Sequence, residues 1–144
     1  MTKPTAWPHG APRVGDRASL SRTVQPTDIA LFTELSGDRN PLHYDREAAE
    51  RTRFGEIVVQ GGVTSAILNA VVAERLPGPG SVFLETHWRF LAPTRPGDTI
   101  RGEVEVTAVR EDKPITTLAT RVVRQDDVVV LEGTSVCWTM DVAP

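Results

Sequence analysis

Beyond residue 80 the chain alternates apolar and polar positions, the period of a β-strand that buries one face. In residues 82–90 this alternation predicts one apolar face, made of Val82, Leu84, Thr86, Trp88 and Phe90. Residues 100–108, 115–123 and 128–138 continue the pattern, and an earlier, weaker run covers residues 18–24. Consecutive strands joined by short turns predict an antiparallel meander.

Before residue 80 the apolar residues follow helical spacing. A first helix is predicted from Pro26, with Thr27 as its N-cap and Gly37 as its stop. A short charged helix is expected over residues 46–51.

The most apolar helix is predicted over residues 63–76. It is apolar nearly all round, which is typical of a buried helix, and Asn69 is its interior polar exception. A long antiparallel sheet needs an apolar cover on one face, and this helix supplies it. The pattern therefore predicts an α+β protein with a single hot-dog fold, in which the sheet wraps around a buried central helix.

Composition narrows the classes of partner. The chain has 144 residues, one cysteine and a net charge of -3, so one domain without a disulfide is expected, and neither nucleic acid nor a membrane is expected as a partner. Residues 1–13 are proline-rich and lack the apolar run of a secretory signal, which predicts a flexible N-terminal arm before a domain over residues 14–144. The lone Cys137 fits the reducing cytoplasm, and its strand position favours a buried apolar role.

Candidate chemistry is concentrated between Gly37 and Asp45. Asn40-Pro41 enforces a bend, so Asp38 and His43 lie on its two sides and can converge as a general acid/base pair. The same residue types also occur in ordinary turns without function. A metal site formed by these acids and His43 is the less favoured alternative, because mixed oxygen ligands beside one histidine are unspecific.

Gly61 and Gly62 precede the predicted buried helix. The first turn of a helix presents free N–H groups and a positive dipole end, which can hold a carbonyl oxygen that becomes negative during a reaction. The alternative interpretation is that these glycines only allow close packing of the helix on the sheet.

The residues Asp38-x-Asn40-Pro41-Leu42-His43-x-Asp45, followed by Phe54 and by Gln60-Gly61, resemble the signature of the MaoC-like dehydratases. The similarity is greatest to the (R)-specific enoyl-CoA hydratases, and it extends over nearly the whole chain. It implies a homodimer of hot-dog domains that reversibly adds water to a trans-2-enoyl thioester of CoA or acyl-carrier protein, yielding the (R)-3-hydroxyacyl thioester.

The resemblance also implies residue roles. Asp38 and His43 would activate the water and deliver the proton, and the Gly61 N–H would hold the thioester oxygen, without a metal or redox cofactor. The residues expected to bind substrate are Asn40, Gln60, Gly61, Gly62 and Asn69.

Three positions depart from the family pattern, and they leave the acyl group open. Gln60 stands where relatives often carry His, Gly62 where Met or Phe is common, and Asn69 where hydratases place a small Ser. Two other functions remain possible on the same fold: an acyl-CoA thioesterase, and a non-catalytic subunit that binds acyl thioesters.

Overall fold

The computed structural model describes residues 6–143 and contains one antiparallel sheet. Its strands are β1 (Arg17–Thr23), β2 (Ser81–Phe90), β3 (Thr99–Val109), β4 (Ile115–Arg124) and β5 (Val129–Thr139). Their spatial order is β1-β3-β4-β5-β2. The expected meander is therefore correct for β3, β4 and β5 and wrong for β2, which pairs with β5. Residues 91–98 separate β2 from β3, and this connection is longer than a tight hairpin loop.

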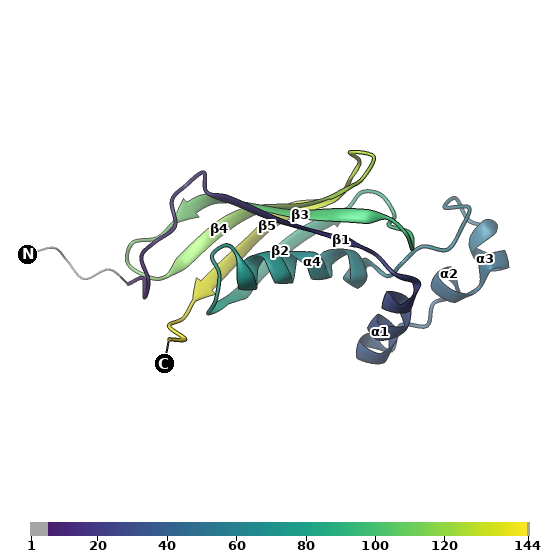
Figure 1. Ribbon diagram of the computed structural model, residues 1–144, viewed down its shortest axis with the longest axis horizontal. Helices are drawn as coiled ribbons and strands as arrows, with labels where there is room; N and C mark the ends of the chain where they lie inside the picture. The colour runs from purple at the N-terminus through teal and green to yellow at the C-terminus, as the bar shows by residue number, and fades with distance from the viewer. Residues whose placement is uncertain (1–5, 144) are drawn as a thin grey trace, which may run out of the picture.

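Helix α4 (Gly61–Glu74) lies along one face of the curved sheet, which confirms the α+β hot-dog architecture (Figure 1). Ile67 and Val71 belong to the core that the helix forms with the strands. Gly102 of β3 permits their close approach, because a Cβ there would lie 2.9 Å from Ile67 Cγ2. The sequence thus places a strand glycine where the helix packs closely on the sheet.

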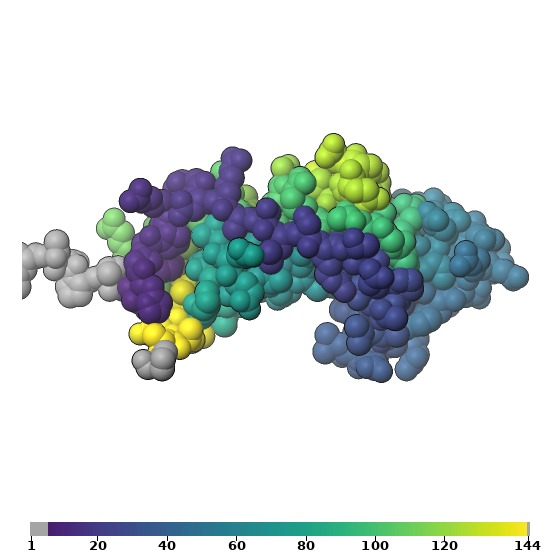
Figure 2. Space-filling model, in the orientation of Figure 1, coloured from purple at the N-terminus to yellow at the C-terminus, as the bar shows by residue number. Residues whose placement is uncertain are grey.

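The expectation that α4 is buried on all sides is wrong. Its sheet-facing residues are buried, whereas Ala66, Asn69 and Ala73 are exposed on the opposite side. Figure 2 shows surface in the teal of this segment between the N-terminal part of the chain and α1 (Pro26–Ser36). The sheet of a single chain covers only one side of the helix, so apolar character all round does not mean burial all round.

A β-bulge changes the predicted face of β2. The register against β5 shifts between Phe83 and Glu85. Phe83 and Trp88 consequently share the core side, where their rings meet edge to face at 5.7 Å. The face predicted for β2 is therefore wrong: Trp88 alone of its five residues is partly buried, and Val82, Leu84, Thr86 and Phe90 are exposed. The bulge accounts for Val82 and Leu84. One extra residue in a strand reverses the alternation on its far side.

Three helices extend beyond one end of the sheet: α1, α2 (Pro41–Tyr44) and α3 (Arg46–Glu50) (Figure 1). The N-cap of α1 is Gln25 and not the predicted Thr27, because the Asp28 carboxylate accepts the Gln25 N–H at 2.8 Å. Asp28 is also bound by Arg22 at 2.6 Å, and this guanidinium holds the pKa of Asp28 below its usual value. Gly37, at φ 79°, ends α1 as expected.

The N-terminal segment is attached to the domain at Trp7. This side chain is buried, and its indole Nε1 donates to the Arg110 carbonyl at 2.9 Å. A flexible arm was expected over residues 1–13, but Trp7 within it is held against the domain. Residues 1–5 lie outside the described part of the chain.

Cys137 is buried in β5, and burial raises the pKa of its thiol to about 11, which agrees with the predicted apolar role. Among the described residues, no helix is long and apolar enough to cross a membrane.

Candidate active site

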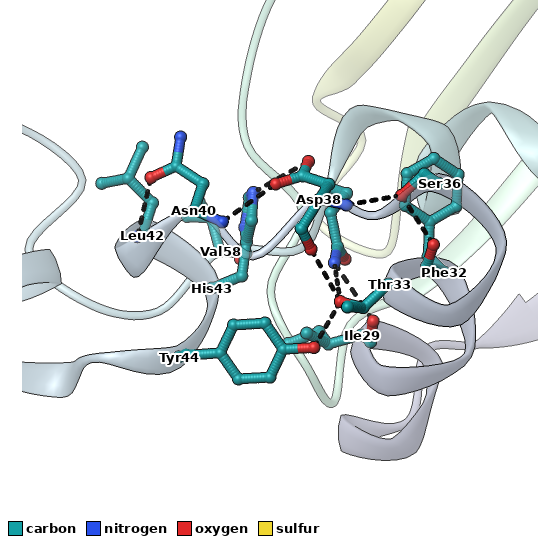
Figure 3. Close-up of polar contacts among 11 residues, drawn as sticks. Ile29, Phe32, Thr33, Ser36, Asp38, Asn40, Leu42, His43, Tyr44 and Val58 are labelled. Carbon is teal, nitrogen blue, oxygen red and sulfur yellow. Dashed lines mark hydrogen bonds and ion pairs between the residues drawn. The ribbon is translucent and has the colours of Figure 1, made fainter.

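The Asp38 loop joins α1 to α2 and is fixed by hydrogen bonds on both main-chain groups (Figure 3). The Asp38 N–H donates to Ser36 Oγ at 3.1 Å, and the Asp38 carbonyl accepts from Thr33 Oγ1 at 2.7 Å. One carboxylate oxygen, Oδ1, accepts the Asn40 N–H at 3.0 Å. The other oxygen, Oδ2, is thereby aimed away from its own loop.

His43 lies in α2, on the other side of the bend at Pro41, and its side chain is only 9% exposed. Its Nδ1 is 2.7 Å from the Val58 carbonyl oxygen. A carbonyl can only accept, so Nδ1 carries the proton in this contact. In the neutral ring, Nε2 is then an acceptor.

The bend brings the two candidate catalytic side chains together, as predicted. His43 Nε2 and Asp38 Oδ2 are 3.6 Å apart. With the neutral histidine tautomer, both atoms are acceptors, and a water molecule can donate one hydrogen to each of them. A water held in this way keeps its lone pairs free for attack, and either acceptor can take its proton. The geometry is that of a water-activating pair.

The start of α4 provides the second element of the site. Val58, which holds His43, is followed two residues later by Gln60, the N-cap of α4. Gly61 and Gly62 form the first turn of α4, whose leading N–H groups have no partner inside the helix. Two aromatic rings flank this turn. A Cβ on Gly61 would lie 3.1 Å from Phe90 Cε1, and a Cβ on Gly62 would overlap the ring of Phe32. The absence of a Cβ on each glycine therefore leaves room for these two rings beside the first turn.

Gln60 is directed into the protein and is 1% exposed. Its Nε2 donates to the Ile29 carbonyl at 3.1 Å and to Thr33 Oγ1 at 3.2 Å, which ties α4 to α1. Its Oε1 is buried without a hydrogen-bond partner among the described residues. A buried amide oxygen without a donor is costly, and a buried water is the usual partner of such an atom.

Asn40 and Asn69 differ in their relation to the pair. Asn40 Oδ1 accepts the Leu42 N–H at 3.1 Å and so caps α2, which places Asn40 beside the pair in a local structural role. Asn69 was expected to be buried and hydrogen-bonded, and this is wrong: it is exposed, and within residues 6–143 its side chain forms no hydrogen bond. At about 1.5 Å per residue, it lies about 12 Å along the helix from Gly61. The described chain does not bring Asn69 to the pair.

Sequence reasoning missed Thr33, Tyr44 and the Val58 carbonyl. Thr33 is one turn before the end of α1 and is 3% exposed. Its position on α1 is a weak signal, because Thr disfavours helix interiors unless its hydroxyl has a partner. Nothing in the residue type of Val58 marks its carbonyl. Within the described residues, no group of three or more His, Cys, Asp or Glu side chains is placed to hold a metal ion.

Known proteins match most of this chain. The family described as "MaoC like domain" matches residues 11–128. An (R)-specific enoyl-CoA hydratase of Aeromonas caviae is 40% identical over 123 residues, covering 85% of this chain and 92% of the relative. A 3-hydroxybutyryl-CoA dehydratase of Methylorubrum extorquens is 37% identical over 120 residues, covering 83% of this chain and 76% of the relative. The solved structure of the (R)-hydratase from A. caviae involved in PHA biosynthesis superposes with a TM-score of 0.84 at 38% identity, covering 89% of this chain and 97% of the other.

Proposed function

The chain belongs to the family of MaoC-like domains, and from that premise we propose that it adds water reversibly to trans-2-enoyl-CoA, with Asp38 and His43 as the catalytic pair. The product is the (R)-3-hydroxyacyl-CoA. Relatives named for this hydration and for the reverse dehydration are 37% to 40% identical over more than four-fifths of the chain. The observation that carries the assignment of the pair is the 3.6 Å separation of two acceptor atoms, Asp38 Oδ2 and His43 Nε2.

The proposed reaction is a syn addition on one face of the double bond. The water shared by Asp38 and His43 loses a proton to the pair while its oxygen forms a bond to the β-carbon. The π electrons of the double bond move toward the thioester oxygen, and the α-carbon then receives a proton from the pair. In total one O–H bond and the π bond of the alkene break, one C–O and one C–H bond form, and no electrons are gained or lost.

Gly61 supplies the electrostatic part of the proposal. Negative charge develops on the thioester oxygen as the β-carbon is attacked. The free N–H of Gly61 and the positive end of the α4 dipole stabilise that charge. Gly61 is exposed and has no side chain, so the proposed route of the thioester oxygen to this N–H is from solvent, past the Phe90 ring that lies 3.1 Å from the position of a Cβ.

We also propose that the working unit is a homodimer formed through β2. This strand is an edge of the sheet, and Val82, Leu84 and Phe90 are exposed on it. An apolar strand edge without a partner is a template for pairing with a second copy. Since Phe90 lies against Gly61, the partner subunit would border the acyl site. The buried single thiol of Cys137 fits the cytoplasm, where we propose that the enzyme works.

The test is hydration of crotonyl-CoA, followed as loss of the ultraviolet absorbance of the conjugated thioester, with chiral analysis of the product. We expect Asp38→Asn and His43→Ala each to lower kcat/KM by about 10²–10⁴-fold, and the double variant to be little worse than either. His9→Ala is the matched control, because this histidine is 60% exposed in the N-terminal segment, outside β2 and the pair, and should leave the rate unchanged.

Two results would contradict the proposal. Wild-type activity retained by Asp38→Asn or by His43→Ala would exclude these two residues as the catalytic pair. Release of free thiol without formation of a 3-hydroxyacyl product would instead support the thioesterase alternative, in which water attacks the carbonyl carbon.

A further inference from the structure

One buried hydroxyl connects the three parts of the candidate site. Thr33 Oγ1 lies 2.7 Å from the Asp38 carbonyl oxygen, forms a short hydrogen bond with the Tyr44 hydroxyl, and accepts from Gln60 Nε2 at 3.2 Å. Asp38 is the acid of the pair, Tyr44 adjoins His43 in α2, and Gln60 is the N-cap of α4. Figure 3 shows Thr33 between Asp38 and Tyr44.

The chemistry of the partners fixes the direction of every bond. A threonine hydroxyl has one hydrogen and can accept two. The Asp38 carbonyl can only accept, so the Thr33 hydrogen points to it. Gln60 Nε2 can only donate, and Tyr44 must then also donate its hydroxyl hydrogen to Thr33. All three bonding positions of the Thr33 oxygen are used, and the hydroxyl has a single orientation.

The Thr33 bond acts on the carboxylate through the main chain. The peptide group that carries the Asp38 carbonyl is followed by Arg39 and then by Asn40, whose N–H holds Asp38 Oδ1. If that carbonyl is released, the loop can rotate and the Asn40 N–H moves with it. Oδ2 then loses the direction that places it 3.6 Å from His43 Nε2.

We propose that Thr33 is a positioning residue for the catalytic pair, and that Tyr44 and Gln60 fix the direction of its hydrogen. The hydroxyl ties the Asp38 loop, the helix of His43 and the start of α4 into one unit. Misplacement of a catalytic group by about 1 Å can cost about 10²-fold in rate. The inference rests on the proposed hydration, and its test includes a measurement that does not depend on activity.

The decisive variants are Thr33→Val and Thr33→Ser. Valine keeps the shape and removes the hydroxyl, so we expect kcat for crotonyl-CoA hydration to fall about 10- to 100-fold while KM stays nearly constant. Serine restores the hydroxyl and should recover most of kcat. The matched control is Thr107→Val, which removes a hydroxyl that donates to the Thr117 carbonyl on the sheet, at 3.2 Å, and should leave kcat unchanged.

Tyr44→Phe removes the hydrogen bond that Tyr44 donates to Thr33 and leaves the Thr33 hydroxyl in place. We expect a smaller loss of kcat than in Thr33→Val, because the Thr33 hydrogen still reaches the Asp38 carbonyl. The double variant Thr33→Val/Tyr44→Phe should match Thr33→Val alone, since Tyr44 acts through Thr33. Fully additive losses of kcat would contradict the claim that Tyr44 acts through Thr33.

Crystal structures of the Thr33 variants provide the test that is independent of activity. We expect the distance from Asp38 Oδ2 to His43 Nε2 to be longer in Thr33→Val than in a crystal structure of the wild-type chain, and to be retained in Thr33→Ser. An unchanged distance in Thr33→Val overturns the positioning role even if the enzyme proves to have another activity. A lower melting temperature with unchanged kcat assigns Thr33 to stability alone, which also overturns it. Failure of the wild-type chain to hydrate any enoyl-CoA counts against the proposed function, and the distances still decide the role of Thr33.

Discussion

Replacement of Asp28 by Asn tests how α1, the helix that carries Thr33, is held in place. The Asp28 carboxylate is 6% exposed, caps the helix through the Gln25 N–H at 2.8 Å, and binds Arg22 at 2.6 Å. Asn keeps the shape and can keep the cap, but it removes the negative charge that binds Arg22 and favours the helix N-terminus. The variant therefore isolates the contribution of the charge.

The expected loss follows from those contacts. A hydrogen bond between charged groups contributes about 1.5–3 kcal/mol. Arg22 is 49% exposed, however, and solvent reduces such a pair toward about 0.2–1 kcal/mol. The helix N-terminus adds about 0.3–1 kcal/mol for a negative charge. We expect Asp28→Asn to lower the free energy of unfolding by about 0.5–2 kcal/mol at pH 7.

The pH dependence distinguishes charge from shape. Arg22 lowers the pKa of Asp28 from an ordinary value of 3.8, so the folded state favours the ionised form. Such a group stabilises the fold above pH 3.8, and its contribution is lost as the pH falls through the lowered folded-state pKa. The difference between wild type and Asp28→Asn should therefore be full at pH 7 and disappear in strong acid.

Urea unfolding followed by tryptophan fluorescence, at pH 7 and at successively lower pH, measures this difference. Asp45→Asn is the control, because Asp45 caps α3 through the Ala48 N–H from an exposed position and Asn caps equally well. A loss of stability in Asp28→Asn that is the same at every pH would refute the charge argument. So would an unchanged stability at pH 7.

Three further outcomes are expected. Gly62→Ala should lower the free energy of unfolding by about 1–3 kcal/mol, because the new Cβ overlaps the Phe32 ring; unchanged urea unfolding would contradict this contact. Asn69→Ser should leave the melting temperature unchanged because Asn69 is exposed. A shift in preferred enoyl-CoA chain length would support its acyl-site role, and an unaltered profile would remove it. Leu84→Lys should convert a dimer of 15.7 kDa subunits into monomers in light scattering, whereas a monomeric wild type would refute the β2 interface.

Local pattern was sufficient for much of the fold. The alternation over residues 100–108 predicted Ile100, Gly102, Val104 and Val106 correctly, because every second residue of a strand with one buried face is buried. It was wrong for Ala108, which is exposed and follows a register shift after Val106. The bend at Asn40-Pro41 likewise depends on neighbouring residues only. It was enough to predict that Asp38 and His43 meet, since both lie within one short segment.

Features that depend on distant partners were not predictable in this way. The bulge in β2 is set by its register against β5, and no residue type in the β2 sequence indicates it. Thr33 meets Gln60 across 27 positions of sequence, so their hydrogen bond has no local pattern. The prediction that Asn69 is buried failed for another reason. Apolar neighbours on α4 indicate that the face of Ala66, Asn69 and Ala73 will be covered, but no part of the described chain covers it.

The order of the strands determines when the site can form during folding. β3, β4 and β5 are joined through short turns, so their pairing closes small loops and is kinetically favoured. β1 reaches β3 only by closing a long loop, with Arg17 opposite Glu105, and that loop contains α1, α2, α3 and α4. The segment that carries Asp38 and His43, the proposed catalytic pair, therefore lies inside the loop whose closure is slowest in this topology. We expect catalytic competence to be among the last properties that the folding chain acquires, after most of its sheet is already protected from solvent exchange.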